Sequence, residues 1–178
     1  METYTYQASI AKGSTKMFEI KNIDGKVVGS FQRYYQSTLH SVMDNLIGND
    51  NLIVRMKAMD GEGNLKIDAF RKNYPIKKPD YYIHIVDDSG MEKNFHARQL
   101  NNILINPEFL IKSNGVEIIS KTAFLDWVRF YEKGMEVARW RVRPKEKLKA
   151  YIEIEEHASI KEPLFYAVLG QMLYYIGQ

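Results

Sequence analysis

Cysteine is absent from all 178 residues of the chain. This absence excludes disulfide bonds, thiolate nucleophiles and zinc sites built on cysteine, and it suits a reducing compartment. The first seven residues also lack the basic region and the apolar core of a secretory signal. The sequence therefore predicts a cytoplasmic protein.

Charge of one sign is not in large excess. The 25 basic and 22 acidic residues leave a net charge of +3, which neither demands nor excludes an anionic partner. A hydrophobic fraction of 45% is ordinary for a soluble globular protein, and a chain of this length suffices for one well-packed domain. We therefore expect a single domain over residues 1–178.

Signatures of catalysis and of metal binding are also missing. The glycines at Gly61 and Gly63 lack the lysine and the following helix of a phosphate-binding loop, and no Gly-x-Ser-x-Gly motif occurs. The histidines lack the i,i+4 spacing of a helical metal site, although His84 and His96 fall on one proposed hairpin and can be neighbours there. The sequence predicts no cofactor, no metal ion and no enzymatic activity.

Helical periodicity is scarce before residue 159, and short alternating runs separated by turn signals predict β-structure instead. Asp24-Gly25 suits the positive φ angles of a type I′ hairpin turn, and similar glycine-containing turns follow. The expected strand pairs are 17–23 with 26–34, 51–59 with 64–71, 81–86 with 92–98, 109–112 with 116–122, and 124–132 with 135–142. Five hairpins result.

Three further segments complete the β-rich part. Residues 147–156 alternate most regularly and predict a last strand, whereas residues 73–79, with two prolines, indicate a connection. Residues 39–47 fit either a strand or a short helix, because their apolar positions satisfy helical spacing without forbidding a strand. We expect about a dozen strands in all.

The last stretch, residues 159–178, is the only long apolar segment with the character of a helix. Ser159 and Glu162 have the spacing of a capping box, and Pro163 fits the first helical turn. Residues 164–176 are apolar around most of the helical circumference, with Gln171 as the polar interruption. Such a helix is buried in protein or in a membrane. About thirteen residues are too few for a span of roughly 20, so burial inside the domain is favoured.

The strand count and the helix together predict the architecture. Barrels larger than eight strands must enclose something, and a helix about 10 Å across suits a barrel of about twelve strands. We therefore predict a mainly β fold, a closed antiparallel barrel of about twelve strands around a central hydrophobic C-terminal helix. The alternative is a sandwich with the helix on one face, which would leave half of the helix exposed.

This pattern of meanders with short glycine-containing turns, followed by residues 149–154 (Lys-Ala-Tyr-Ile-Glu-Ile) and a terminal hydrophobic helix, resembles the tubby C-terminal-like superfamily. The superfamily includes tubby proteins, phospholipid scramblases and LURP-one-related proteins. The resemblance implies a twelve-stranded antiparallel barrel around a central helix. For function the resemblance implies less, because tubby domains bind phosphoinositide headgroups and scramblases act at membranes, whereas small stand-alone LURP-one-like proteins have no settled activity. No tubby lipid-binding motif matches positions here, and the cysteine-rich and proline-rich regions of scramblases are missing.

The most unusual local feature is a ladder of six basic residues at alternate positions from 139 to 149. If the chain turns near residues 144–146, the ladder shares one outward face, with Arg143 opposite Lys147 and Arg141 opposite Lys149. Such a surface either binds an anionic partner or is neutralised by neighbours such as Asp126, Glu153 or Glu155. The ladder comprises Arg139, Arg141, Arg143, Lys145, Lys147 and Lys149.

A second basic stretch contains Arg71 and Lys72, followed by Tyr74 and by Lys77 and Lys78. An aromatic residue beside basic ones in a loop can contact a base or a lipid interface, or the stretch can simply keep a loop soluble. The small net charge disfavours nucleic acid.

The functional hypothesis combines these features. We expect a non-enzymatic cytoplasmic barrel that binds an anionic ligand, such as a phospholipid headgroup at a membrane surface, through Arg139, Arg141, Arg143, Lys147 and Lys149, with Arg71 and Lys72 as further candidates. The first alternative is a structural or protein-interaction domain without lipid affinity. The second is an enzyme of unknown class. No transmembrane segment is predicted.

Overall fold

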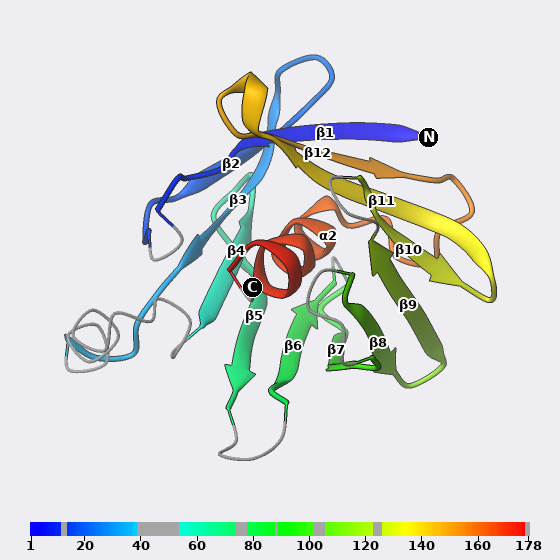
Figure 1. Ribbon diagram of the computed structural model, residues 1–178. Coiled ribbons are helices and arrows are strands. Elements are labelled where there is room, and N and C mark those ends of the chain that lie inside the picture. The colour runs from blue at the N-terminus through cyan, green and yellow to red at the C-terminus, as the bar shows by residue number, and fades with distance from the viewer. Residues whose placement is uncertain are drawn as a thin grey trace.

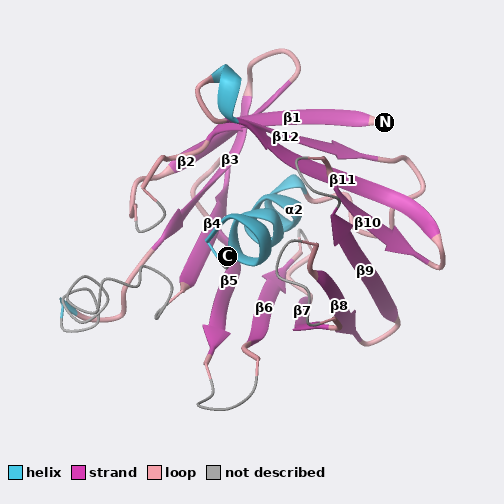
Figure 2. Cartoon of the chain, in the orientation of Figure 1, coloured by secondary structure: helices cyan, strands magenta, loops and turns pink. Residues whose placement is uncertain are grey.

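The computed structural model describes residues 1–11, 14–38, 54–73, 78–87, 89–101, 106–122 and 126–176. These residues form twelve antiparallel strands that close into a barrel around one C-terminal helix, seen end-on in Figure 1 and coloured by element type in Figure 2. Each strand pairs with its neighbours in chain order, and β1 pairs with β12 to close the barrel. The predicted fold is confirmed, and the sandwich is wrong.

The predicted hairpins are also found. The strands are β1 (Glu2–Gln7), β2 (Phe18–Asn22), β3 (Val27–Arg33), β4 (Arg55–Asp60), β5 (Leu65–Lys72), β6 (Asp80–Val86), β7 (Glu92–Gln99), β8 (Glu108–Ser113), β9 (Val116–Thr122), β10 (Val128–Glu132), β11 (Met135–Arg143) and β12 (Lys149–Ile154). Residues 39–47, which the sequence left open between strand and helix, lie outside the described residues.

Alternation of side chains explains why the strands close around an apolar interior. In β12, Ala150, Ile152 and Ile154 are buried inside the barrel, whereas Lys149 and Tyr151 lie on its outer face. The same two-residue period recurs along β4 and β6. One face of each strand therefore contributes to the core, and the other is available for binding.

The helix fills the interior. It begins as α2 (Pro163–Leu169) and continues as a π-helical segment, η2 (Gly170–Ile176). All seven residues of α2 are buried. Pro163 occupies the first turn as predicted, but the predicted capping box is wrong. Glu162 is itself the N-cap, because its carboxylate accepts a hydrogen bond from the Leu164 N–H at 3.1 Å.

Polar groups inside the barrel have partners that fix the helix in place. The Trp140 indole N–H donates to the Tyr6 hydroxyl at 2.9 Å, and Tyr6 donates to the Gln171 amide oxygen at 3.1 Å. Tyr174 and Ser120 share a hydrogen bond of 2.7 Å. Burial raises the pKa of Tyr6 and of Tyr174, so both hydroxyls keep their protons at any physiological pH. The lumen is therefore packed rather than open.

Three hairpin turns use one side-chain device. The side-chain oxygen of Asn22 accepts hydrogen bonds from the N–H groups two and four residues later, and Asp60 and Asp87 do the same. In the first turn only Gly25 has a positive φ, of 80°, so Asp24-Gly25 is not the expected type I′ pair. The side-chain cap takes the place of a second left-handed residue.

Hydrogen bonds from Asn64 and from Ser89 are the largest causes that lower the pKa of Asp60 and of Asp87, respectively. A lowered pKa in the folded state adds stability above the unfolded value, and this stability is lost as the pH falls through the folded value. Because Asn22 caps its turn without charge, the double variant Asp60→Asn/Asp87→Asn should keep its fold, but its urea midpoint at pH 7 should be somewhat lower, since it lacks the charge-dependent stability. Its midpoint should fall less than that of the wild type between about pH 5 and pH 2. Parallel pH profiles would contradict this role.

Candidate functional site

The basic ladder lies on the outer face of β11 and β12, close to where the two strands meet. Arg143 is paired with Lys149 and Arg141 with Tyr151, so the predicted register is wrong by two residues. The chain forms a 3-10 turn, η1 (Pro144–Glu146), and Lys147 then adopts a left-handed conformation with φ of 55°. The connection between the paired residues Arg143 and Lys149 is therefore two residues longer than predicted, which shifts the register. The shift is even, so the ladder residues on the two strands still share the outer face.

Acidic neighbours neutralise part of the ladder. Arg139 forms an ion pair with Glu153, its cross-strand partner, as the sequence allowed. Arg143 pairs with Glu146 at 2.6 Å within the turn. Asp126, another predicted neighbour, pairs instead with Arg129 on β10. These contacts are exposed or half-exposed, so each contributes little to stability.

Arg141 and Lys149 differ from their neighbours. Neither has a carboxylate within 4 Å among the described residues. The Arg141 guanidinium lies 4.1 Å from the centre of the Trp127 ring, and its Nε is buried without a hydrogen-bond partner in the described part of the chain. The Lys149 ammonium lies 5.3 Å from the centre of the Tyr151 ring. Both cations therefore rest on aromatic faces without a close ion-pair partner in the described part of the chain.

A hollow of about 450 Å³ adjoins Lys149 on the outer surface of β1 and β2. These two strands pair only at Tyr4–Asn22 and Thr5–Lys21. They separate toward Gln7, where β1 ends. Lys21 lines the hollow together with Lys149, and Lys21 is paired with Glu19 at 3.3 Å. The hollow therefore has room for an anionic group beside the ladder.

The second basic stretch is not part of this site. Arg71 and Lys72 end β5, far around the barrel from β11 and β12 in strand order. Arg71 lies 6.0 Å from the centre of the buried Tyr81 ring, and Lys72 is exposed. Lys78 donates to the carbonyl of Asn101, while residues 74–77 lie outside the described ranges. The ladder and the second basic stretch lie on different strands, and they have in common only that both are near the same end of the barrel.

That end carries an excess of positive charge, a property that the sequence reading missed. Because the strands run antiparallel in chain order, β1, β3, β5, β7, β9 and β11 end at one rim, and the even-numbered strands begin there. We call this the basic rim. Its charged strand-end residues are Arg33, Arg55, Lys72, Arg143 and Lys149 against Asp80 and Glu108, and the described connections add Lys16, Lys78, Lys145 and Lys147 against Asp126 and Glu146.

The opposite end, the acidic rim, has the reverse balance. Its charged strand-end residues are Glu2, Asp60, Glu92 and Glu132, and all are acidic. The described connections add Asp24, Glu62, Asp87, Glu155, Glu156 and Glu162 against Lys26, Lys133 and Lys161. The barrel is therefore electrically polar along its axis although its net charge is small. The alternating direction of the strands would have predicted this charge difference between the rims, but only if the exact bounds of the strands had been known.

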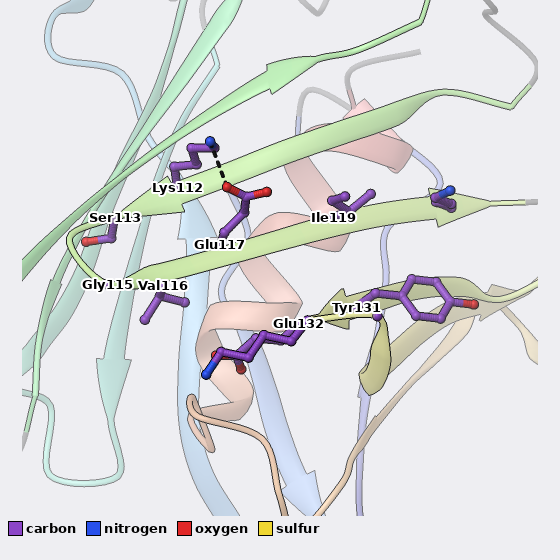
Figure 3. A pocket seen from close by; sticks show the side chains of 11 residues that line it. Lys112, Ser113, Gly115, Val116, Glu117, Ile119, Tyr131 and Glu132 are labelled. Carbon is purple, nitrogen blue, oxygen red and sulfur yellow. Dashed lines mark ion pairs between the residues drawn. The ribbon is translucent and has the colours of Figure 1, made fainter.

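A larger hollow, of about 840 Å³, lies on the outer faces of β8, β9 and β10 (Figure 3). Lys112 lines it and is paired with Glu117 at 2.7 Å, and Lys121, also in the lining, is paired with Glu108 at 3.8 Å. Tyr131 contributes an aromatic ring to the lining. No sequence pattern indicated this hollow, whose charges are mixed and largely compensated by ion pairs.

His84 and His96 do not form a common site. His84 pairs across the strands with Asn94, and His96 pairs with Tyr82, so the two histidines are not directly opposite. His84 hydrogen-bonds to Asn94 at 2.9 Å, and His96 lies 3.1 Å from Asp80. The described residues contain no group of three or more His, Asp or Glu side chains arranged to hold a metal ion.

Comparison with known proteins agrees with this geometry. Within the described ranges, each helix falls short of the length and the hydropathy that crossing a bilayer requires. No curated protein and no solved structure matches the chain. A sequence profile for the Tubby C-terminal like domain matches residues 4–176, nearly the whole chain. With its closed twelve-stranded barrel and central helix, the chain belongs to the Tubby C-terminal-like domain family.

Proposed function

We propose that this domain is a non-enzymatic binding module that takes a phosphate-bearing anionic headgroup at Arg141 and Lys149. The observation that supports the proposal is that the residues of the ladder differ in whether they have a carboxylate partner. Arg139 and Arg143 have carboxylate partners, whereas Arg141 and Lys149 have none among the described residues. A surface that served only solubility would need no such distinction.

The two aromatic rings support the same function. Trp127 holds the Arg141 guanidinium by a cation–π contact, and Tyr151 lies under both Arg143 and Lys149, at 4.8 and 5.3 Å from its ring centre. These contacts restrict the cations before a ligand arrives, which lowers the entropy lost on binding. The adjoining hollow gives room for the bulk of a headgroup. Cytoplasmic membrane leaflets are anionic, so a cytoplasmic, peripheral location fits the proposal.

Charge reversal tests the site. Arg141→Glu/Lys149→Glu should lower binding to vesicles of phosphatidylcholine, phosphatidylserine and phosphatidylinositol bisphosphate by roughly 100-fold or more, because each basic residue near such a surface contributes about 1 kcal/mol. Co-sedimentation at several salt concentrations measures this loss, and the wild-type affinity should fall as salt rises.

The matched control is Lys26→Glu/Lys161→Glu, which changes the net charge equally with two exposed lysines at the acidic rim. It should retain most of the vesicle binding. Equal losses in the two double variants would show that only net charge matters, and unchanged binding by Arg141→Glu/Lys149→Glu would remove the ladder as the site.

A protein-interaction role is the alternative function. The observation that favours it is the hollow on β8–β10, because its paired lysines and glutamates and its tyrosine resemble a surface for a mixed-charge partner more than a phosphate site. A wild-type protein that ignores every vesicle composition would support this alternative. An enzyme of unknown class is the third candidate, and a thermal-shift panel of metabolites would test it.

A further inference from the structure

We infer that the barrel meets an anionic bilayer end-on, with its basic rim toward the lipid and the Ile10 side chain inserted among the headgroups. This inference rests on the proposed lipid function and adds an orientation and an insertion residue to it. It is derived from the charge separation along the barrel axis and from the way the chain presents Ile10.

Exposed apolar residues alone do not select a rim. Ile10 follows β1 at the basic rim and is 87% exposed, and Ile23 lies in the β2–β3 turn at the acidic rim and is 84% exposed. Each is an isoleucine whose side chain is almost fully in water. Isolated exposed apolar residues are common on soluble proteins. A further property must distinguish the two ends.

Charge distinguishes them. The anionic surface of a bilayer attracts the basic rim and repels the acidic rim. Lys145 and Lys147 in the β11–β12 connection are exposed, and no carboxylate lies within 4 Å of either among the described residues. Near the acidic rim, Ile23 is instead followed directly by Asp24. The basic rim therefore combines an exposed isoleucine with an excess of basic residues, whereas Ile23 lies among an excess of acidic ones.

The backbone around Ile10 is tied to the same part of the barrel. The Ala8 N–H donates to the Leu148 carbonyl at 3.0 Å, which joins the start of the β1–β2 connection to the end of the β11–β12 connection. The Gln7 side chain donates to the Lys147 carbonyl. On the other side, the Tyr175 hydroxyl at the end of the helix donates to the Ser9 carbonyl at 2.6 Å. These contacts hold residues 7–9, directly before Ile10, beside Lys147 and Leu148 of the β11–β12 connection.

The proposed site has a compatible position. Lys149 begins β12 after the connection that contains the η1 turn, and Arg141 lies two residues before the end of β11. Both are therefore near the basic rim. A barrel lying end-on would place them at the level of the headgroups while Ile10 reaches the boundary with the acyl chains.

The absence of cysteine makes a direct test simple. Ile10→Cys and Ile23→Cys each introduce one thiol, which can carry the environment-sensitive fluorophore nitrobenzoxadiazole. Vesicles of phosphatidylcholine with phosphatidylserine and phosphatidylinositol bisphosphate should shift the emission at position 10 to the blue and increase it severalfold. The probe at position 23 should not respond. Vesicles of phosphatidylcholine alone should change neither.

Co-sedimentation of the same samples distinguishes a failure of the end-on orientation from a failure of lipid binding itself. If the vesicles bind the protein but the probe at position 23 responds, or neither probe responds, the end-on orientation is wrong and the proposed lipid binding stands. If the unlabelled wild type does not bind these vesicles, the proposed function fails and the orientation fails with it. As a second measure, Ile10→Ser should weaken wild-type vesicle binding by about tenfold, and Ile23→Ser should leave it unchanged.

Discussion

Ending the chain before Ile160 should abolish cooperative unfolding and leave an insoluble or molten product. The reason is that the removed segment is the content of the barrel. Its large apolar side chains would each contribute about 1.5–3 kcal/mol, and together on the order of 10 kcal/mol, which is comparable to the whole net stability of a domain. These side chains, all 1% exposed or less, are Leu164, Phe165, Val168, Leu169, Met172 and Leu173.

A graded substitution provides the control for this truncation. Leu169→Ala keeps the helix and removes only part of one side chain, so the protein should stay folded and lose about 2–5 kcal/mol. Thermal melting followed by near-ultraviolet circular dichroism and dye binding to exposed apolar surface would compare the two. A shortened chain that melts cooperatively near the full-length temperature would show that the strands close without their contents.

The sequence was sufficient for the fold because the fold depends on local signals. Glycine-containing turns marked the hairpins, and an apolar helix without a polar face required an enclosure. The errors in the predicted strand register and in the predicted helix cap arose where a residue adopts a conformation or a position that is unusual for its type. Lys147 and Leu148 both adopt positive φ angles that lysine and leucine seldom take, so the β11–β12 register was displaced. Glu162 caps the helix directly although aspartate, asparagine and serine are the usual caps.

The candidate site was less predictable because it depends on which charges meet across strands. Alternation alone placed Arg139, Arg141 and Arg143 on one face correctly. It could not show that Glu153 and Glu146 neutralise two of them and leave Arg141 on Trp127, since these contacts follow from register and turn shape. The difference in charge between the two rims was equally hard to predict, because it too depends on how the strands are arranged. A residue contributes to one rim or the other only through the direction of its strand.

Gly170→Ala should destabilise the protein by about 2–3 kcal/mol, although alanine normally favours a helix over glycine. A Cβ at position 170 would lie 2.4 Å from the indole ring of Trp140, closer than real Cβ contacts allow. Trp140 cannot move freely, because its indole N–H is bonded to Tyr6 in the buried network. The melting temperature should fall by about 5–10 °C.

Gly61→Ala is the matched control, since it makes the same substitution at a position without a positive φ and with its nearest neighbour atom 3.7 Å away. It should change the free energy of unfolding by no more than about 0.5 kcal/mol. In a Trp140→Ala background, Gly170→Ala should lose its cost, because the ring it contacts is gone. Equal costs of Gly170→Ala with and without Trp140, measured by urea unfolding, would show that the indole does not determine how closely the helix approaches β11.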